Sequence, residues 1–279
     1  MKVLTIGNSF SEVMTALLPP VAKSTGVEIE VEDLTIGGCT MERHWGNIVR
    51  EAEEPGYHYF EEGTYKAKLV SKTWDFVTIQ QASHESWRLA SYRPYAKQLF
   101  DFIKKNAPTA EVLLQMTWTW RQDDSRYAWP QIQSEENMYN NLVSSYETIA
   151  AELGLRVIPT GIAIETARNT QPNPYIPFNP ADYTYPDLPD VSNSFNNAVW
   201  WNEDHTAIVG DPAHLNPRGD FLQACVWFGT LTGKSIKDIT YQPEGVSAED
   251  ADFLKQTAQA VLDIYRQPRE RNGRQAPID

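Results

Sequence analysis

Short apolar segments alternate along the chain with longer segments in which apolar residues recur every three or four positions. The short segments predict five buried strands, at residues 3–6, 27–34, 75–79, 111–115 and 155–158. The longer segments predict helices, at about residues 11–24, 92–106, 134–153, 219–232 and 248–265. Alternating strands and helices are typical of a parallel sheet with helices on both faces. The pattern therefore predicts a three-layer α/β/α fold with a doubly wound, five-stranded parallel sheet.

Two segments do not fit this alternation. Residues 170–201 are rich in Pro, Asn and Asp, and so many prolines are incompatible with a helix or a central strand. We expect an irregular insertion there, of the kind that is often functional. Residues 267–279 are predicted to form a solvated tail. The five strands with their crossover helices describe one domain, so residues 1–279 are expected to form a single domain, and the sequence contains no internal repeat.

The net charge of the chain limits the classes of molecule that it is expected to bind. Its 279 residues include 37 acidic and 24 basic ones, which gives a net charge of -13. A surface of this sign repels nucleic-acid phosphates and anionic lipid headgroups, so neither a nucleic acid nor a membrane is an expected partner. No run of residues approaches the ~18 apolar positions that a membrane span needs. A small molecule or a glycan is the expected partner, and the oligomeric state stays open.

The cysteines and the N-terminal segment bear on the cellular compartment. Cys39 and Cys225 are too few for a disulfide framework and lack the spacing of a zinc site, and the sequence leaves open whether they pair. The first residues have neither the apolar stretch nor the cleavage site of a signal peptide. We therefore expect a cytoplasmic protein, or a secreted or periplasmic one whose leader has already been removed.

Ser9 lies at the point where the first predicted strand ends and the first helix begins. In open α/β sheets, ligands bind at the carboxyl edge of the strands. The backbone N–H groups and the positive end of the following helix can stabilise an anion there. The alternative interpretation is that Ser9 only caps the helix, because serine is a favoured N-cap residue.

The segment Asp211-Pro212-Ala213-His214 lies in a predicted loop just before a helix. A carboxylate three residues before a histidine can bind the imidazole Nδ1 and leave Nε2 free to take a proton from a serine hydroxyl. One alternative is a surface loop in which Asp211 helps to cap the helix. Another is a metal site that adds Asp204 and His205 to Asp211 and His214. No Gly-x-Gly-x-x-Gly or Walker A segment supports a nucleotide cofactor.

These two segments together resemble the SGNH (GDSL-type) hydrolases. Gly7-Asn8-Ser9-Phe10-Ser11 is similar to the first block of that family, and the segment from Asp211 to His214 is similar to its last block, in the same chain order. The family also has a glycine after the second strand, whose N–H binds the oxyanion; the resemblance puts this role on Gly38, with Gly37 as the neighbouring alternative. It further implies a flavodoxin-like sheet and no metal or organic cofactor. The α/β-hydrolase pattern, Gly-x-Ser-x-Gly after an internal strand, is not found at Ser9.

The sequence departs from the family pattern at two places. The first block has Asn8 and Phe10 where the common signature has Asp and Leu. The third block lacks the family's asparagine, whose side chain donates to the oxyanion, and has two glutamines instead. Strand side chains alternate between faces, so only one of them is expected to face the site, and we assign Gln81. Gln80 and His84 remain alternatives.

Several tryptophans follow the predicted strands. Trp118 and Trp120 come after the fourth strand, at the expected active-site edge, and are our candidates for substrate contact. Aromatic side chains present broad apolar faces, which suit the apolar face of a sugar ring. Arg121, beside them, is expected to be a solvated surface residue rather than a ligand for an acidic group.

We therefore expect a serine esterase that acts through an acyl-enzyme, with Ser9 as nucleophile, His214 as base and Asp211 as the residue that orients the base. The N–H groups of Ser9 and Gly38 and the amide of Gln81 would bind the oxyanion. The resemblance to deacetylating branches of the family favours an acetylesterase acting on a carbohydrate. The alternatives are a non-catalytic glycan-binding protein on the same scaffold and an acylhydrolase of the lipase or thioesterase type.

Overall fold

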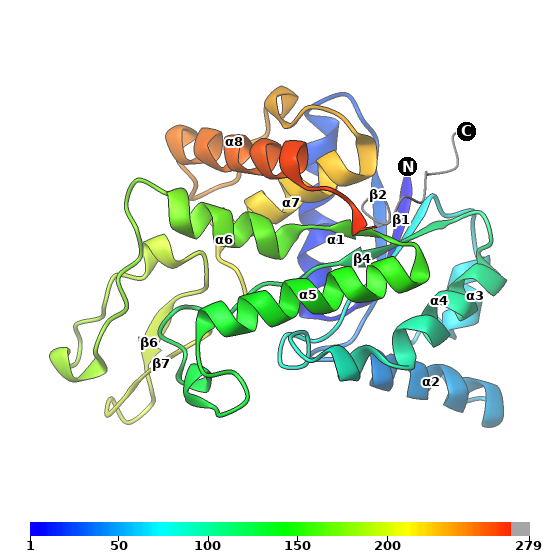
Figure 1. Ribbon diagram of the computed structural model, residues 1–279, viewed down its shortest axis with the longest axis horizontal. Helices are drawn as coiled ribbons and strands as arrows, with labels where there is room; N and C mark the ends of the chain where they lie inside the picture. Colours follow the sequence, from blue (N-terminus) through cyan, green and yellow to red (C-terminus); the bar gives the residue numbers. More distant parts are fainter. Residues whose placement is uncertain (269–279) are drawn as a thin grey trace.

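Five parallel strands form the central sheet of the computed structural model, which describes residues 1–268 (Figure 1). The spatial order of the strands is β2-β1-β3-β4-β5. In chain order, the strands are β1 (Lys2–Gly7), β2 (Glu30–Thr35), β3 (Phe76–Ile79), β4 (Glu111–Gln115) and β5 (Arg156–Ile158). All four pairings are parallel. The predicted fold class is thus confirmed.

Helices cover both faces of this sheet because its inner strands are apolar on both sides. Val3 belongs to the hydrophobic cluster on one face of the sheet, and its neighbour Leu4 belongs to the cluster on the other face. One face is covered by α1 (Ser9–Lys23), α6 (Thr160–Thr170), α7 (Pro217–Thr232) and α8 (Ala248–Ile264). The other face is covered by α2 (Met41–Glu53), α3 (Tyr65–Val70), α4 (Tyr95–Asn106) and α5 (Glu135–Leu153). Two large cores result, one on each side of the sheet.

Helix α7 lies at the centre of its layer, where it contacts α1, α6 and α8. All but a few of its residues are buried, as expected for a helix that is surrounded on several sides. The side chain of Asn216 caps its first turn by accepting hydrogen bonds from the backbone N–H groups of Arg218 and Gly219. This cap fixes the start of α7 immediately after the predicted catalytic loop.

The structure contains elements that the apolar pattern did not predict. The helices α2, α3 and α6 were not among the predicted elements: α3 and α6 are short, and α2 is mostly polar, although its Met41, Trp45 and Ile48 recur at helical spacing. The irregular segment at residues 170–201 is confirmed over most of its length, but its end forms β6 (Val199–Trp201), which pairs with β7 (Ile208–Gly210) as an antiparallel hairpin. This hairpin lies far from the N-terminus (Figure 1).

Two smaller points concern the cysteines and the chain end. Cys39 and Cys225 are both buried and form no disulfide. The predicted tail begins too early, because the side-chain amide of Gln267 pairs with the backbone N–H and carbonyl of Val157 on the edge strand β5. The remainder of that predicted tail, residues 269–279, lies outside the described residues. Among the helices of residues 1–268, none has the length and apolar character to cross a membrane.

Candidate active site

Ser9 is the first residue of α1, directly after the end of β1. The helix cap is Asn8, whose side-chain oxygen accepts a hydrogen bond of 3.1 Å from the backbone N–H of Phe10. The alternative interpretation of Ser9 as the cap is therefore wrong. Because the neighbouring residue caps the helix, the Ser9 hydroxyl is available for other contacts.

The structure brings Ser9, His214 and Asp211 together in one row. The hydroxyl of Ser9 lies 2.7 Å from His214 Nε2, although 205 positions separate the two residues. His214 Nδ1 lies 2.7 Å from a carboxylate oxygen of Asp211. The second carboxylate oxygen of Asp211 accepts hydrogen bonds from the backbone N–H groups of Ala213 and His214. The turn thus fixes the carboxylate and the imidazole relative to each other.

This contact shifts the pKa of both partners. Burial raises the pKa of Asp211, but hydrogen bonds from the side chain and backbone of His214 outweigh it, and the net pKa lies below the ordinary value. The hydrogen bond to Asp211 raises the pKa of His214, against the opposing effect of burial. The negative charges of Asp220 and Glu12 raise it further. An ionised Asp211 therefore holds a proton on Nδ1, and Nε2 can accept one from Ser9.

A second loop is tied to the Ser9 loop through Asn8. The side-chain amide of Asn8 donates to the backbone carbonyl of Cys39, at 3.0 Å, and its oxygen accepts from Gln80 Nε2 at 2.7 Å. Gly38, next to Cys39, has φ +61, a left-handed conformation that favours glycine. The backbone N–H of Gly38 has no acceptor within residues 1–268. The loop thus holds a free N–H donor close to the Ser9 loop.

Gln81 does not offer a free donor, which corrects the prediction that its amide binds an oxyanion. Both of its amide N–H groups are used by Ser91, through the backbone carbonyl at 3.0 Å and the hydroxyl at 3.1 Å. Its oxygen accepts from the backbone N–H groups of Met41 and Ala82. Gln80 is the glutamine beside the Ser9 loop, but its amide donates to Asn8. His84 is exposed in the turn that follows β3.

Of the two predicted aromatic contacts, only Trp118 lies at the site. Its ring stacks on Phe10 with centroids 4.3 Å apart, and its Nε1 donates to the backbone carbonyl of Ala213. Trp120 is fully buried in a separate cluster beside Tyr127, which corrects its assignment to substrate contact.

A cavity of about 230 Å³ opens between these elements. Its lining combines the polar residues Ser9, Asn197, His214 and Asp220 with the apolar residues Phe10, Val13, Trp118 and Leu215. A space of this size lies below the range of pockets for drug-sized ligands and suits a small group. The predicted nucleophile and base thus share one small cavity with Trp118.

Arg121 is not the solvated residue that the sequence suggested. It is buried, and its guanidinium donates to Asp123 and to the backbone carbonyl of Asn197. Its backbone N–H donates to the carbonyl of Pro212, next to Asp211. Arg121 therefore joins three loops around the site and has a structural role.

The residues of the alternative metal site do not converge. His205 lies at the turn of the β6–β7 hairpin and stacks on Tyr185, with ring centroids 3.8 Å apart. Within residues 1–268, no group of three or more His, Cys, Asp or Glu side chains is arranged to hold a metal ion. His214 therefore contacts Ser9 and Asp211, and it does not contact His205.

Two residues near the site were missed by sequence reasoning. His44 is completely buried, with Nε2 2.8 Å from the carbonyl of Gly7 and Nδ1 2.7 Å from the hydroxyl of Tyr65. It lies on α2, a helix that the apolar pattern did not predict. Asp220 lines the cavity, and its position in the first turn of α7 made it look like an ordinary acidic residue at a helix start.

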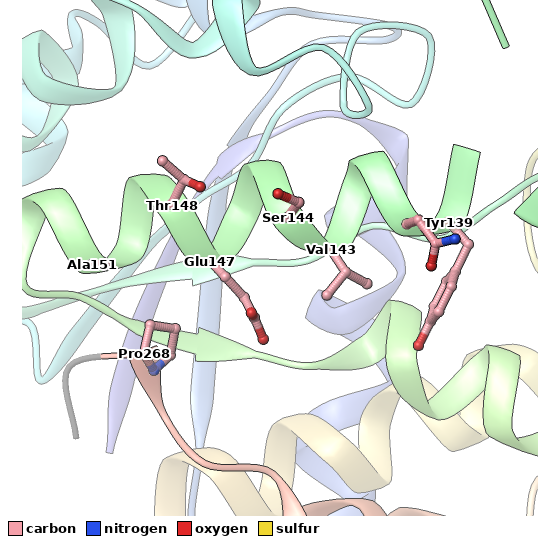
Figure 2. A pocket seen from close by; sticks show the side chains of 8 residues that line it. Tyr139, Val143, Ser144, Glu147, Thr148, Ala151 and Pro268 are labelled. Carbon is pink, nitrogen blue, oxygen red and sulfur yellow. The ribbon is translucent and has the colours of Figure 1, made fainter. Parts of the chain in front are cut away.

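A larger cavity, of about 400 Å³, lies along α5 and ends at Pro268 (Figure 2). The side chains of Tyr139 and Glu147 border it. Its lining includes neither Ser9 nor His214, and it contains no histidine. The predicted nucleophile and base therefore lie at the smaller cavity and not at this one.

Comparisons with known proteins identify the family of the chain and proteins of similar fold. Residues 2–203 match the family described as "Domain of unknown function (DUF4886)". A search of the curated proteins found no match. Among solved structures, a DUF4886 family protein from Bacteroides uniformis is similar, with 24% identity, a TM-score of 0.75 and 95% of each chain covered.

Two further solved structures are similar at lower identity. A protein from Slackia heliotrinireducens that is described as an SGNH hydrolase has 19% identity and a TM-score of 0.52, over 83% of this chain and 98% of that one. A protein from Parabacteroides merdae that is described as a GDSL-like lipase has 13% identity and a TM-score of 0.51, over 83% of this chain and 95% of that one. These likenesses show a shared fold.

Proposed function

The chain belongs to the DUF4886 family and has the α/β/α fold of the SGNH hydrolases, and on this basis we propose that it is a serine esterase. The observation that carries the proposal is the row of Ser9, His214 and Asp211, in which both side-chain contacts measure 2.7 Å. A serine within hydrogen-bond reach of a histidine that a carboxylate orients is the arrangement of an activated nucleophile.

In the proposed reaction, His214 Nε2 takes the proton of the Ser9 hydroxyl while the serine oxygen attacks the ester carbonyl. Asp211 stays ionised and stabilises the imidazolium that forms. The tetrahedral intermediate then expels the alcohol, which receives the proton from His214, and leaves the acyl group on Ser9. A water molecule, deprotonated by His214, releases the acid and restores the serine.

The developing oxyanion needs fixed donors. The backbone N–H of Ser9, at the first position of α1, has no acceptor within its own helix, and the N–H of Gly38 is also free within residues 1–268. We assign the oxyanion to these two groups. Asn8 supports the assignment because it joins the two loops that carry them.

We propose a small acyl group, acetyl in the first instance, as the part of the ester that is transferred. The cavity of about 230 Å³ supports this choice, because it gives little room for a long acyl chain. A carbohydrate is the proposed alcohol. Trp118 gives this choice little support, since the residue is only 2% exposed and one face of its ring is covered by Phe10.

The test is hydrolysis of para-nitrophenyl acetate, followed by acetate release from a panel of acetylated oligosaccharides. The Ser9→Ala variant should lose at least about 1,000-fold in kcat/KM. Ser11→Ala is the matched control, because the Ser11 hydroxyl donates to the carbonyl of Asn8 and does not contact His214. The wild type should also form an adduct with a fluorophosphonate on Ser9.

Two outcomes would contradict the proposal. Hydrolysis that persists in Ser9→Ala would exclude this nucleophile. A wild type that hydrolyses no acetyl ester and forms no fluorophosphonate adduct would favour a non-catalytic protein on this scaffold, and binding of unmodified oligosaccharides would then be the activity to measure.

A further inference from the structure

The cavity beside Ser9 contains a carboxyl group that the proposed mechanism does not use. Asp220 lies in the first turn of α7 and lines the cavity together with Ser9 and His214. Its carboxyl oxygens have no hydrogen-bond partner among residues 1–268. The charge of His214 lies close enough to lower its pKa, against the larger effect of burial. A carboxyl group that faces a cavity without a partner is available to a ligand.

We infer that Asp220 is a specificity residue, whose carboxyl group forms a hydrogen bond with a hydroxyl group of the substrate in the cavity. Esters with a hydroxyl close to the ester bond, on the acyl side or the alcohol side, would then be preferred over esters with a methyl group in its place. The inference rests on the proposed esterase function of the same cavity.

The surroundings of Asp220 explain why a substrate hydroxyl would matter there. Much of the cavity wall is apolar, formed by the side chains of Phe10, Val13, Trp118 and Leu215. An apolar group of the substrate placed against the Asp220 carboxyl would remove its water without replacing the lost hydrogen bond, which is costly. A hydroxyl at the same place restores that bond. The cavity is thus built to discriminate between groups of equal size but different polarity.

The ionisation of Asp220 favours a hydroxyl over a charged partner. Burial raises the pKa of Asp220 to about 7, with an opposing effect from the nearby charge of His214. Both forms of the carboxyl group are therefore present near neutral pH. A hydroxyl donates to the ionised form and accepts from the protonated form. The ionised form would repel a substrate carboxylate, and the neutral form has no charge that could pair with a substrate ammonium group.

Two pairs of esters test the inference, each differing only by a hydroxyl in place of a methyl group. The first pair, 2-hydroxyethyl acetate and propyl acetate, places the difference on the alcohol side. The second pair, ethyl glycolate and ethyl propionate, places it on the acyl side. The measured quantity is the ratio of kcat/KM within each pair, compared between wild type and Asp220→Leu, so that the intrinsic reactivity of each ester cancels.

The ratio for at least one pair should fall by about 10-fold or more in Asp220→Leu, and the pair that responds identifies the side of the hydroxyl. Asp220→Ala is the second variant, in case leucine disturbs the start of α7. Glu12→Gln is the matched control: Glu12 also raises the pKa of His214, but it is exposed and does not line the cavity. Its ratios should equal those of the wild type.

The outcomes separate this inference from the proposed function. Ester hydrolysis that depends on Ser9, with ratios that are the same in wild type and in both Asp220 variants, overturns the inference alone. Ratios that change equally in Glu12→Gln also overturn it, since the effect would then act through His214. Absence of Ser9-dependent hydrolysis of all four esters, with no fluorophosphonate adduct on Ser9, overturns the proposed function and the inference with it.

Discussion

The side-chain amide of Asn8 donates a hydrogen bond of 3.0 Å to the backbone carbonyl of Cys39, 31 positions further along the chain. This contact joins the loop that carries Ser9 to the loop that carries Gly38. Asn8 is almost completely buried, so water does not compete for the bond. The common family signature has Asp at this position, and an ionised Asp has no donor for a carbonyl.

We therefore expect Asn8→Asp to lower the stability of this protein, although Asp is the residue at this position in the common signature of the SGNH hydrolases. The carboxylate would face the Cys39 carbonyl without a proton, and the free energy of unfolding should fall by about 1–3 kcal/mol. kcat/KM should fall with it, because the Gly38 loop loses its anchor. Urea unfolding and hydrolysis of para-nitrophenyl acetate measure the two effects.

Asn106→Asp is the control for this substitution. Asn106 also donates its side-chain amide to a backbone carbonyl, that of Phe102, but it lies at the end of α4, away from the site. This variant should lose stability without losing kcat. Equal losses of kcat in the two variants would mean that the bond from Asn8 to Cys39 has no special effect on the site.

Gly38 and Gly37 are neighbours with different backbone conformations, and this difference gives the second prediction. Gly38 has φ +61, whereas Gly37 is outside the positive-φ region, and an added Cβ meets no atom within 4 Å at either position. Gly38→Ala should therefore cost about 1 kcal/mol through backbone strain alone, and it should reduce kcat by moving the N–H assigned to the oxyanion. Gly37→Ala should change neither quantity appreciably. A larger loss of kcat in Gly37→Ala would move the assignment to that residue.

The third prediction concerns the pH dependence that Asp211 imposes. His214 acts as a base only when it is neutral, so kcat/KM should fall as the pH drops below the pKa of His214. The hydrogen bond to Asp211 raises that pKa above its ordinary value, against the effect of burial. Asp211→Asn removes the charge, and the acid limb of the pH profile should move to lower pH while kcat falls by about 100-fold to 10,000-fold. An acid limb that stays in place would show that Asp211 does not control His214.

The contacts of the candidate site that the sequence predicted are those in which local spacing determines geometry. Ser9 comes two positions after the end of the buried strand β1, and Asp211 lies three positions before His214, so the strand edge and the turn fix their positions. The two ends converge because α1 and α7 pack together, with Ser9 at the start of α1 and His214 three positions before the start of α7.

The parts that were predicted wrongly depend on side-chain directions in loops. Gln80 and Gln81 follow the end of β3, and which of them turns toward Asn8 depends on partners far away in the sequence, such as Ser91 and Met41. Trp120 is buried because the chain after β4 folds back over Tyr127. His44 could not be predicted because its partner Tyr65 lies in a separate helix, 21 positions away.

His44 gives the last prediction, which concerns stability. The imidazole is completely buried, and burial lowers its pKa to about 4, against the opposing effect of its hydrogen bond with Gly7. The unfolded chain binds a proton at His44 below about pH 6.5, whereas the folded protein does not until the pH approaches 4. The stability that the neutral imidazole provides is therefore complete above pH 6.5 and is lost as the pH falls through this window.

The expected loss from His44 between pH 7.5 and pH 5 is about 2 kcal/mol, since each unit of pKa shift corresponds to about 1.4 kcal/mol. His44→Gln should remove this loss, because its amide can donate to the Gly7 carbonyl and accept from Tyr65 but does not titrate. Urea unfolding at the two pH values measures the difference, in which the carboxylates common to both proteins cancel. His58→Gln is the control, because His58 is exposed and its imidazole bonds to the carbonyl of Phe60, two positions away. The pH dependence of the free energy of unfolding could instead be the same in His44→Gln and in His58→Gln. That result would mean that His44 is protonated in the folded state and that no neutral imidazole donates to the Gly7 carbonyl.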